Sequence, residues 1–380
     1  MLAIAEDLRG LVTACRVQAP LLTLKRQGIV SEYVITDSDL TGLSPDFAFD
    51  VLWVQRAPAI RLAERIVERF AGSYLHDMDD LLFAEPSYVR AGEFPDRDSL
   101  RAVADSAAVF TAPSGRLVQL AEKHGAVSLS GKCMIVPNAL EFPAQPPREP
   151  KRPRGILFTQ SHRLALTESR EAVLGAVRRF AAGAGLPVHY FGPPPDVLGA
   201  GVADLLGPVV ACGYLDFWRY HAALAAWPSM IGVAPLETVG DPMTLEFVAA
   251  KSDVKMVEYA GFGHPAVYSD APPYADSDLS SGALSTNTAE GWTQALEGIF
   301  EDGWQRAELE QAAATAARSL ERVAREGWAP ALRKVALLEP RSASELLDRR
   351  RVGRSVPRIL RRFDPTYGER RPGPETTSRA

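Results

Sequence analysis

Short apolar runs alternate with amphipathic stretches along most of the chain, and this pattern predicts strands covered by helices. The runs Asp50–Gln55 and Ala108–Ala112 predict buried strands, and the stretch from Arg61 to Phe70 has the period of a helix. A second series starts at Ile156. Its strand-like runs are Val188–Phe191, Met230–Ala234 and Ala266–Tyr268. Such alternation is typical of parallel sheets, so the sequence predicts an α/β protein.

A proline-rich segment separates the two series. Residues 143–155 contain five prolines, which neither a helix nor a central strand tolerates, so we predict an interdomain linker there. The predicted domains are a first Rossmann-like domain over residues 1–142 and a second over 156–335, followed by an arginine-rich tail over 336–380. Ligands of such sheets bind beyond the carboxyl ends of the strands, so we expect a site in the cleft between the domains.

The most informative segment, Lys251–Asp270, predicts a helix followed by a buried strand. Ser252 is suited to cap the helix, apolar residues recur at helical spacing, and glycines and a proline predict its end. Lys251, Lys255 and Glu258 then share one face of the helix. This face carries the candidate chemistry of the chain.

Two ammonium groups beside the free N–H groups of a helix N-terminus suit a diphosphate, which the helix dipole also favours. A carboxylate one turn further on can accept hydrogen bonds from a ribose diol, as in dinucleotide-binding folds. The pattern leaves open a second interpretation, in which Lys255 and Glu258 form an exposed ion pair worth a few tenths of a kcal/mol.

Together with Gly232–Leu236 and Ser269–Tyr274, this segment resembles the donor-binding half of GT-B glycosyltransferases, in particular the retaining glycosyltransferase family four of bacteria. Further fragments resemble successive strand ends of these enzymes, in the expected order. They are Val109–Ser114, Ile135–Leu140, Gly155–His162 and Val188–Gly192. The resemblance covers residues 1 to 330 and implies a GT-B arrangement of two Rossmann-like domains with a cleft between them.

The resemblance implies roles for individual residues. Lys251, with Lys255 beside it, is the first choice to stabilise charge on a departing diphosphate, and Arg163 and His162 at a strand end are further candidates. The residues assigned to donor binding are Glu258, Ser252, Asp253, Val254 and Tyr274. Of these, Glu258 is expected at the ribose. Tyr274 either closes over the nucleotide or fills the core.

One position departs from the family pattern. Members carry two glutamates separated by seven residues, and Glu258 matches the second, whereas Ala250 occupies the first. In this chain the sugar would then be held by Glu246, by Asp253 or by the backbone N–H groups of residues 251–254.

The acidic stretch Asp77–Asp80 favours a competing hypothesis, because an Asp-x-Asp after a strand holds a divalent metal in GT-A glycosyltransferases. We expect an acceptor-side or structural role and no metal, since the second-domain helix already supplies positive groups. His76 and Asp77 would be the base candidates in an inverting enzyme. Arg16 and Arg56 lie at positions that resemble first-domain positions of related enzymes. The alternative is that both are surface charges.

Composition narrows the class of protein. With 46% hydrophobic and 23% charged residues the chain is typical of a globular protein, and we find no secretion signal and no apolar run near the roughly 18 residues of a membrane span. Three cysteines and six histidines show neither disulfide nor metal-site spacing. We therefore expect a cytoplasmic protein.

Charge is distributed unevenly. Residues 341–380 hold eleven arginines, no lysine and five acidic residues, a formal +6, so the rest of a chain of net charge −5 carries −11. The arginines can contact anionic lipid at the inner face of the cell membrane, or form a solvated tail. The acidic remainder argues against nucleic acid as a partner.

The leading hypothesis is a glycosyltransferase that uses a nucleotide diphosphate sugar as donor, without a further cofactor, and a saccharide or lipid-linked acceptor in surface polysaccharide or glycoconjugate synthesis. A nucleotide-sugar epimerase can share the fold and is the first alternative. A catalytically inactive nucleotide-sugar-binding protein, suggested by Ala250, is the second.

Overall fold

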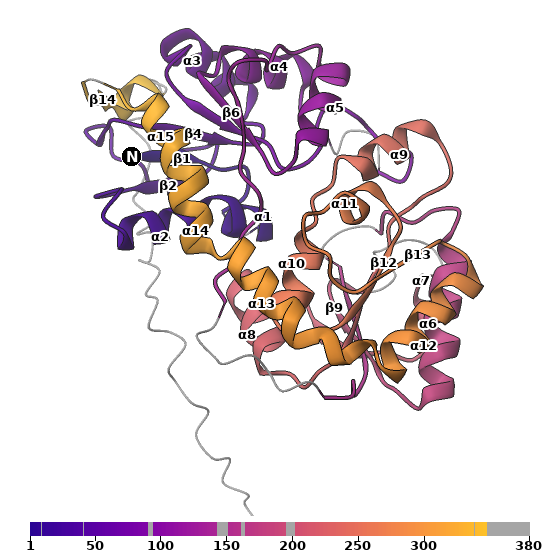
Figure 1. The fold of residues 1–380 in the computed structure, drawn as a ribbon. Helices are drawn as coiled ribbons and strands as arrows, with labels where there is room; N and C mark the ends of the chain where they lie inside the picture. Colours follow the sequence, from indigo (N-terminus) through magenta and orange to yellow (C-terminus); the bar gives the residue numbers. More distant parts are fainter. Residues whose placement is uncertain are drawn as a thin grey trace, which may run out of the picture.

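The computed structural model shows two parallel β-sheets, each covered by helices (Figure 1). It describes residues 1–8, 10–40, 42–89, 94–142, 151–160, 164–194, 202–337 and 339–347. The two sheets come from successive parts of the chain. This confirms the predicted α/β class with two Rossmann-like domains.

The first sheet has six parallel strands in the order β2-β1-β4-β5-β6-β7. They are β1 Leu2–Ile4, β2 Val34–Thr36, β4 Leu52–Gln55, β5 Leu75–Asp77, β6 Val109–Ala112 and β7 Cys133–Ile135. The helices are α1 Leu11–Thr13, a π-helical turn Ala14–Gln18, α2 Ala19–Arg26, α3 Ile60–Phe70, α4 Arg97–Ser106 and α5 Gly115–Gly125. Strands β4 and β6 are buried throughout, which explains why they appear as apolar runs in the sequence.

The second sheet is also parallel and has the order β10-β9-β8-β11-β12-β13. Its strands are β8 Ile156–Thr159, β9 Val188–Phe191, β10 Val210–Gly213, β11 Ile231–Ala234, β12 Ala266–Ser269 and β13 Ala283–Ser285. Its helices are α6 Arg170–Ala184, α7 Val202–Leu206, α8 Phe217–Ala226, α9 Pro242–Ala249, α10 Val254–Gly261, α11 Pro272–Ala275 and α12 Ala289–Glu301.

The last helices return from the second domain to the first. Helix α13, Ala307–Arg318, packs on α10, whereas α14, Leu320–Val323, and α15, Ala329–Val335, lie on the first domain (Figure 1). A π-helical turn, Ala324–Trp328, lies between α14 and α15. The centre of the Trp328 ring is 4.3 Å from that of Trp53 on β4, with the two ring planes tilted by 34°. From the sequence, the second domain is predicted to extend to residue 335. In the structure, the residues after 319 pack on the first domain.

The segment after α15 also contacts the first domain. Strand β14, Arg341–Ser342, pairs antiparallel with β3, Ala48–Phe49. Residues 348–380, which hold most of the arginine-rich tail, lie outside the described residues, as does 143–150 of the predicted linker. None of the helices within the described ranges is both long and apolar enough to cross a membrane.

The two chain crossings between the domains are hydrogen-bonded to each other. The N–H of Leu140 donates to the carbonyl of Arg318 at 3.1 Å, and the N–H of Leu320 donates to the carbonyl of Leu140 at 2.9 Å. The ring of Phe142 then passes so close to Gly261 of α10 that a Cβ there would lie 2.0 Å from it. The crossings and the end of α10 therefore form one packed unit.

Candidate functional site

A small pocket of about 30 Å³, partly open to solvent, lies at the carboxyl ends of the second-domain strands. The residues that line it lie at or just after the ends of β8, β9 and β10 or on α8 and α10, and one comes from α1 of the first domain. They are Thr159, Gln160, Phe191, Gly192, Tyr214, Leu215, Tyr220, Lys255 and Leu11. The pocket lies beyond the strand ends, which is the region where such sheets bind ligands.

Lys255 reaches this pocket from the first turn of α10. Its Nζ donates to Glu258 Oε2 at 2.7 Å and lies 5.2 Å from the centre of the Tyr220 ring. The same carboxylate accepts hydrogen bonds from the Tyr220 hydroxyl at 3.2 Å and from His221 Nε2 at 3.3 Å. Glu258 is only 7% exposed, so the carboxylate lies behind Lys255 and holds its ammonium group at the pocket.

The electrostatics of Glu258 follow from these contacts. Burial alone would raise the pKa of the carboxyl, but the charge of Lys255 and the hydrogen bond from His221 outweigh it and lower the pKa to about 2. Glu258 is therefore an anion at neutral pH. The ion pair between Lys255 and Glu258, which the sequence left open as a second interpretation, is present, but it is partly buried and not exposed.

The pH dependence of stability should report this pair. A folded-state pKa of about 2, against 4.5 for the free group, means that the ionised Glu258 stabilises the fold above pH 4.5 and that this contribution is lost as the pH falls towards 2. Between pH 7 and pH 2.5 we expect wild type to lose about 2–3 kcal/mol more unfolding free energy than Glu258→Gln. Urea unfolding at each pH, with the exposed Glu308→Gln as control, measures the difference. A difference that stays constant over this range would contradict the assignment.

The tip of α10 differs from the prediction at Ser252. The helix begins at Val254, because α9 ends at Ala249 and a turn intervenes, so Ser252 lies too early to cap it. The Ser252 hydroxyl instead accepts a hydrogen bond at 2.8 Å from the side chain of Asn138 in the first domain. Asp253 occupies the N-cap position, but its side chain makes no cap bond; its backbone carbonyl accepts hydrogen bonds from the N–H groups of Met256 and Val257, at 2.8 and 3.2 Å.

Lys251 lies in the turn before α10, on the side of the first domain. Its Nζ is 3.7 Å from Asp80 Oδ1 and 4.8 Å from the centre of the Phe247 ring. The sequence predicted that Lys251 and Lys255 lie one turn apart on the same helix face. This prediction is wrong, because Lys251 precedes the helix. Of the two lysines, Lys255 lines the pocket, while Lys251 bridges the domains.

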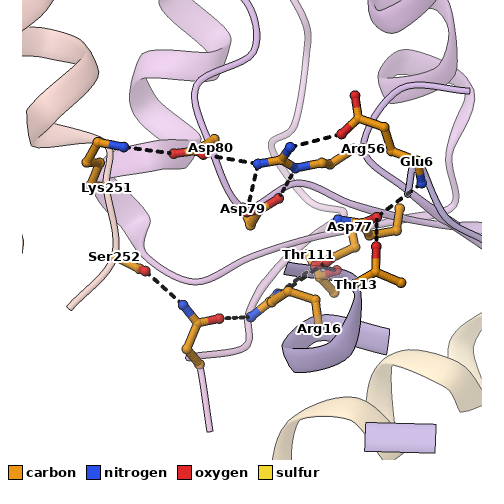
Figure 2. A network of polar contacts seen from close by, with 12 residues as sticks. Glu6, Thr13, Arg16, Arg56, Asp77, Asp79, Asp80, Thr111, Lys251 and Ser252 are labelled. Carbon is orange, nitrogen blue, oxygen red and sulfur yellow. Dashed lines mark hydrogen bonds and ion pairs between the residues drawn. The ribbon is translucent and has the colours of Figure 1, made fainter. Parts of the chain in front are cut away.

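The acidic stretch of the first domain faces cations (Figure 2). Asp79 accepts two hydrogen bonds from Arg56, at 2.7 and 3.1 Å, and Asp80 accepts one at 3.0 Å. Asp77 is fully buried and pairs with Arg16 through both carboxylate oxygens, at 2.5 and 3.2 Å. Neither arginine is a simple surface charge. Within the described ranges, no three His, Cys, Asp or Glu residues cluster in an arrangement for a metal ion.

The Arg16 guanidinium also connects the domains. It donates to the carbonyl of Val136 at 2.7 Å and to Asn138 Oδ1 at 3.1 Å, and Asn138 in turn donates to Ser252 (Figure 2). The guanidinium lies 4.7 Å from the centre of the Trp328 ring. Arg16 comes from the π-helical turn between α1 and α2, a local distortion that is frequent at functional sites. A chain of contacts thus runs from the first sheet to the turn before α10.

The other predicted residues are placed as follows. His76 is buried on β5, where burial lowers its pKa to about 4, so its ring is neutral at pH 7 and has no access to the cleft. Tyr274 is buried, and its ring centre lies 5.0 Å from that of Tyr268. Of the two roles that the sequence left open for Tyr274, this is the one in the core. Glu246 pairs with Lys123 and His124 of the first domain. His162 and Arg163 lie outside the described residues.

Ala250, at the position of the first glutamate of the family pattern, is fully buried where the second domain meets the first. It belongs to an apolar cluster with Phe247 and with first-domain residues such as Leu82 and Phe83. A carboxylate there would be buried without a partner at considerable cost. The alanine therefore fits the closed packing of the two domains.

Sequence reasoning missed two residues that contact Glu258 and one further buried carboxylate of the second domain. Tyr220 and His221 lie on α8, but no local signal links them to Glu258, which is more than 35 residues away. Glu237 follows β11 and is 1% exposed; its carboxylate accepts hydrogen bonds from Thr167, Ser169 and neighbouring N–H groups. Its place just after a strand end was the one signal available.

No protein-family model and no curated protein matches the sequence. Solved structures do match. One is Anabaena HepE in complex with UDP and glucose, 13% identical, covering 86% of this chain and 97% of that chain with a TM-score of 0.53. Another is a glycosyltransferase from Rickettsia africae, 10% identical, covering 88% and 98% with a TM-score of 0.55. Two parallel-sheet domains, a cleft at their strand ends and these likenesses together show that the chain has the GT-B fold.

Proposed function

We propose that this protein is a glycosyltransferase that moves a sugar from a nucleoside diphosphate sugar to a saccharide or lipid-linked acceptor. The observation that carries the proposal is the ammonium group of Lys255, which is held at the pocket by a buried carboxylate, beside the first turn of α10. Cations and free N–H groups at a helix N-terminus are suited to a diphosphate. HepE, which has the same fold, is described with UDP and glucose, so a UDP-sugar is the first donor to test.

The proposed reaction breaks the bond between the anomeric carbon and the diphosphate and forms a new glycosidic bond to an acceptor hydroxyl. Negative charge grows on the departing diphosphate, and Lys255 with the N–H groups of α10 would stabilise it. Preorganised groups of this kind are typically worth a few kcal/mol each in the transition state. We extend the proposal to transfer with retained anomeric configuration and without a metal, in synthesis of a surface polysaccharide or glycoconjugate.

In this scheme the ribose lies near Glu258, whose carboxylate is already engaged by Lys255, Tyr220 and His221. The aromatic part of the pocket, with Phe191 and Tyr214, would take the nucleoside, because flat apolar walls suit a base.

A thermal-shift screen against UDP, GDP, ADP, CMP and dTDP sugars tests the donor. A ligand bound only by the folded protein at 100 times its Kd adds about 2.7 kcal/mol of stability, which raises the melting temperature measurably. We expect one nucleotide to give the largest shift. The absence of a shift across the panel would contradict the proposal.

The stabilising donor is then incubated with and without a panel of saccharide and lipid-linked acceptors. Transfer predicts release of the nucleotide that depends on an acceptor. Conversion of the donor to an isomeric sugar nucleotide without acceptor would instead identify an epimerase. Binding with no turnover under any condition would identify an inactive nucleotide-sugar-binding protein.

A further inference from the structure

His221 contacts one oxygen of the Glu258 carboxylate, and the pocket residues contact the other. The Nε2 atom of His221, on α8, lies 3.3 Å from Glu258 Oε1. Lys255 Nζ and the Tyr220 hydroxyl both donate to Oε2, at 2.7 and 3.2 Å. Because an ionised carboxylate can only accept hydrogen bonds, Nε2 of His221 must carry the proton. The two oxygens of Glu258 therefore have different donors.

Aromatic packing fixes the imidazole of His221. Its ring centre lies 4.2 Å from that of Phe217, the first residue of α8, and 5.3 Å from that of Phe262, which directly follows α10. The residue is only 6% exposed. A side chain packed against rings from two elements keeps one orientation, so its N–H group is a preorganised donor to Oε1.

Without His221, the carboxylate would have a buried oxygen to satisfy. A buried acceptor that loses its partner bears the full cost of its desolvation, so its surroundings rearrange to restore a hydrogen bond. Among the groups that already contact Glu258, Lys255 has a flexible chain and three N–H donors, and it can serve both oxygens. Such a two-point contact would draw the ammonium group onto Glu258 and away from the pocket.

We propose that His221 is a positioning residue that keeps the ammonium group of Lys255 at the pocket by holding Glu258 Oε1. This inference rests on the proposed function, because it concerns the ammonium group that is assigned to the donor diphosphate. His221 is not among the residues that line the pocket, so it acts only through Glu258 and Lys255.

A double-mutant cycle in the full chain tests the proposal. The variants are His221→Phe, Lys255→Met and the double variant, and the probes are inorganic pyrophosphate and uridine diphosphate, with Kd measured by calorimetry. Phenylalanine retains a ring against Phe217 and Phe262 but removes the N–H donor. We expect His221→Phe to raise both Kd values about three- to tenfold. In the Lys255→Met background the same change should alter Kd by less than about twofold, because no ammonium group remains to be positioned.

Two further variants separate this role from a general loss of structure. His221→Gln places an amide N–H near the position of Nε2 and should return Kd to within about twofold of wild type. It also decides the case in which His221→Phe does not fold or Lys255→Met binds too weakly for a Kd. His189→Phe is the matched control: it removes an imidazole from β9 of the same domain, where the ring packs on Trp227 at 4.7 Å, and should leave Kd unchanged.

A second readout needs no ligand. The hydrogen bond from His221 helps to lower the pKa of Glu258 to about 2, so His221→Phe should raise this pKa towards 4.5. Ionised Glu258 stabilises the fold above pH 4.5, and this contribution is lost as the pH falls through the folded-state pKa. The extra loss of stability that wild type shows over Glu258→Gln between pH 7 and pH 2.5 should therefore shrink when both proteins also carry His221→Phe. Urea unfolding of the four proteins measures it.

The outcomes distinguish this inference from the proposed function. Probe binding that His221→Phe leaves unchanged, a rise in Kd that persists in the Lys255→Met background or is not reversed by His221→Gln, or an unchanged pH dependence would overturn the positioning role alone. A wild-type protein that binds neither probe, nor any nucleotide of the thermal-shift panel, would overturn the proposed function and this inference with it.

Discussion

Replacing Lys255 by methionine should lower kcat/KM for the sugar donor by about 10²- to 10³-fold, with the loss mainly in kcat. The physical reason is that the ammonium group at the pocket is worth most when charge develops on the departing diphosphate, and loss of one such group typically costs about 3–4 kcal/mol. Methionine retains an unbranched chain against the Tyr220 ring, so packing is conserved while the charge is lost. Initial rates over a range of donor concentrations measure kcat and KM separately.

The matched control is Lys334→Met, which removes an exposed lysine on α15, far from the pocket residues in sequence and on the first domain. It should leave kcat/KM unchanged. Because Lys255→Met also removes one partner of Glu258, urea unfolding of both variants checks that the protein assayed is folded. Near-normal turnover by a folded Lys255→Met protein would refute the assignment of the site.

The second large effect concerns stability. Replacing Arg16 by methionine should lower the free energy of unfolding by about 3–5 kcal/mol, because it leaves the buried Asp77 carboxylate without its cation. Thr111 alone would remain as a side-chain donor to that carboxylate. The substitution also removes the hydrogen bonds to Val136 and Asn138. Urea denaturation followed by circular dichroism gives the difference directly.

Arg26→Met is the control for burial, because Arg26 lies at the end of α2, the helix that continues from the π-helical turn of Arg16. Arg26 forms an ion pair with Glu141 in which both side chains are about half exposed, at 50% and 45%, so Arg26→Met should cost less than about 1 kcal/mol. Adding Asp77→Asn to Arg16→Met should recover part of the loss, since the uncompensated charge is then gone. Equal losses for Arg16→Met and Arg26→Met would show that the buried pair is not responsible.

Much of the fold was predictable because its strands and helices are locally encoded. The stretch Val188–Phe191 coincides with β9, and the stretch Arg61–Phe70 coincides with α3 to within one residue. Ser114 accepts a hydrogen bond from the N–H of Leu117, as expected of a helix N-cap. Parallel strands buried on both faces give apolar runs, and these are easily recognised. The return of α14 and α15 to the first domain was not predictable, because it depends on contacts with residues hundreds of positions away.

The candidate site was predictable only along a single helix. Lys255 and Glu258 are three residues apart, so helical geometry brings them together whatever the tertiary structure. The same reasoning failed for Lys251 because the helix starts at Val254, so the expected i, i+4 relation between the lysines does not exist. Contacts of the carboxylate with Tyr220 and His221 come from α8 and required the structure.

Because the chain crosses between the domains at both Leu140 and Arg318, cleavage by a protease in the proline-rich segment should not separate the two domains. A nick anywhere between residues 142 and 151 would yield two pieces, and the C-terminal piece would still carry Trp328, which stacks on Trp53 and faces Arg16 in the N-terminal piece. Each piece would thus hold part of the same hydrophobic core. Nicked protein should therefore elute as one species under native conditions and separate only in denaturant, and neither domain can be produced alone by truncation at the proline-rich segment.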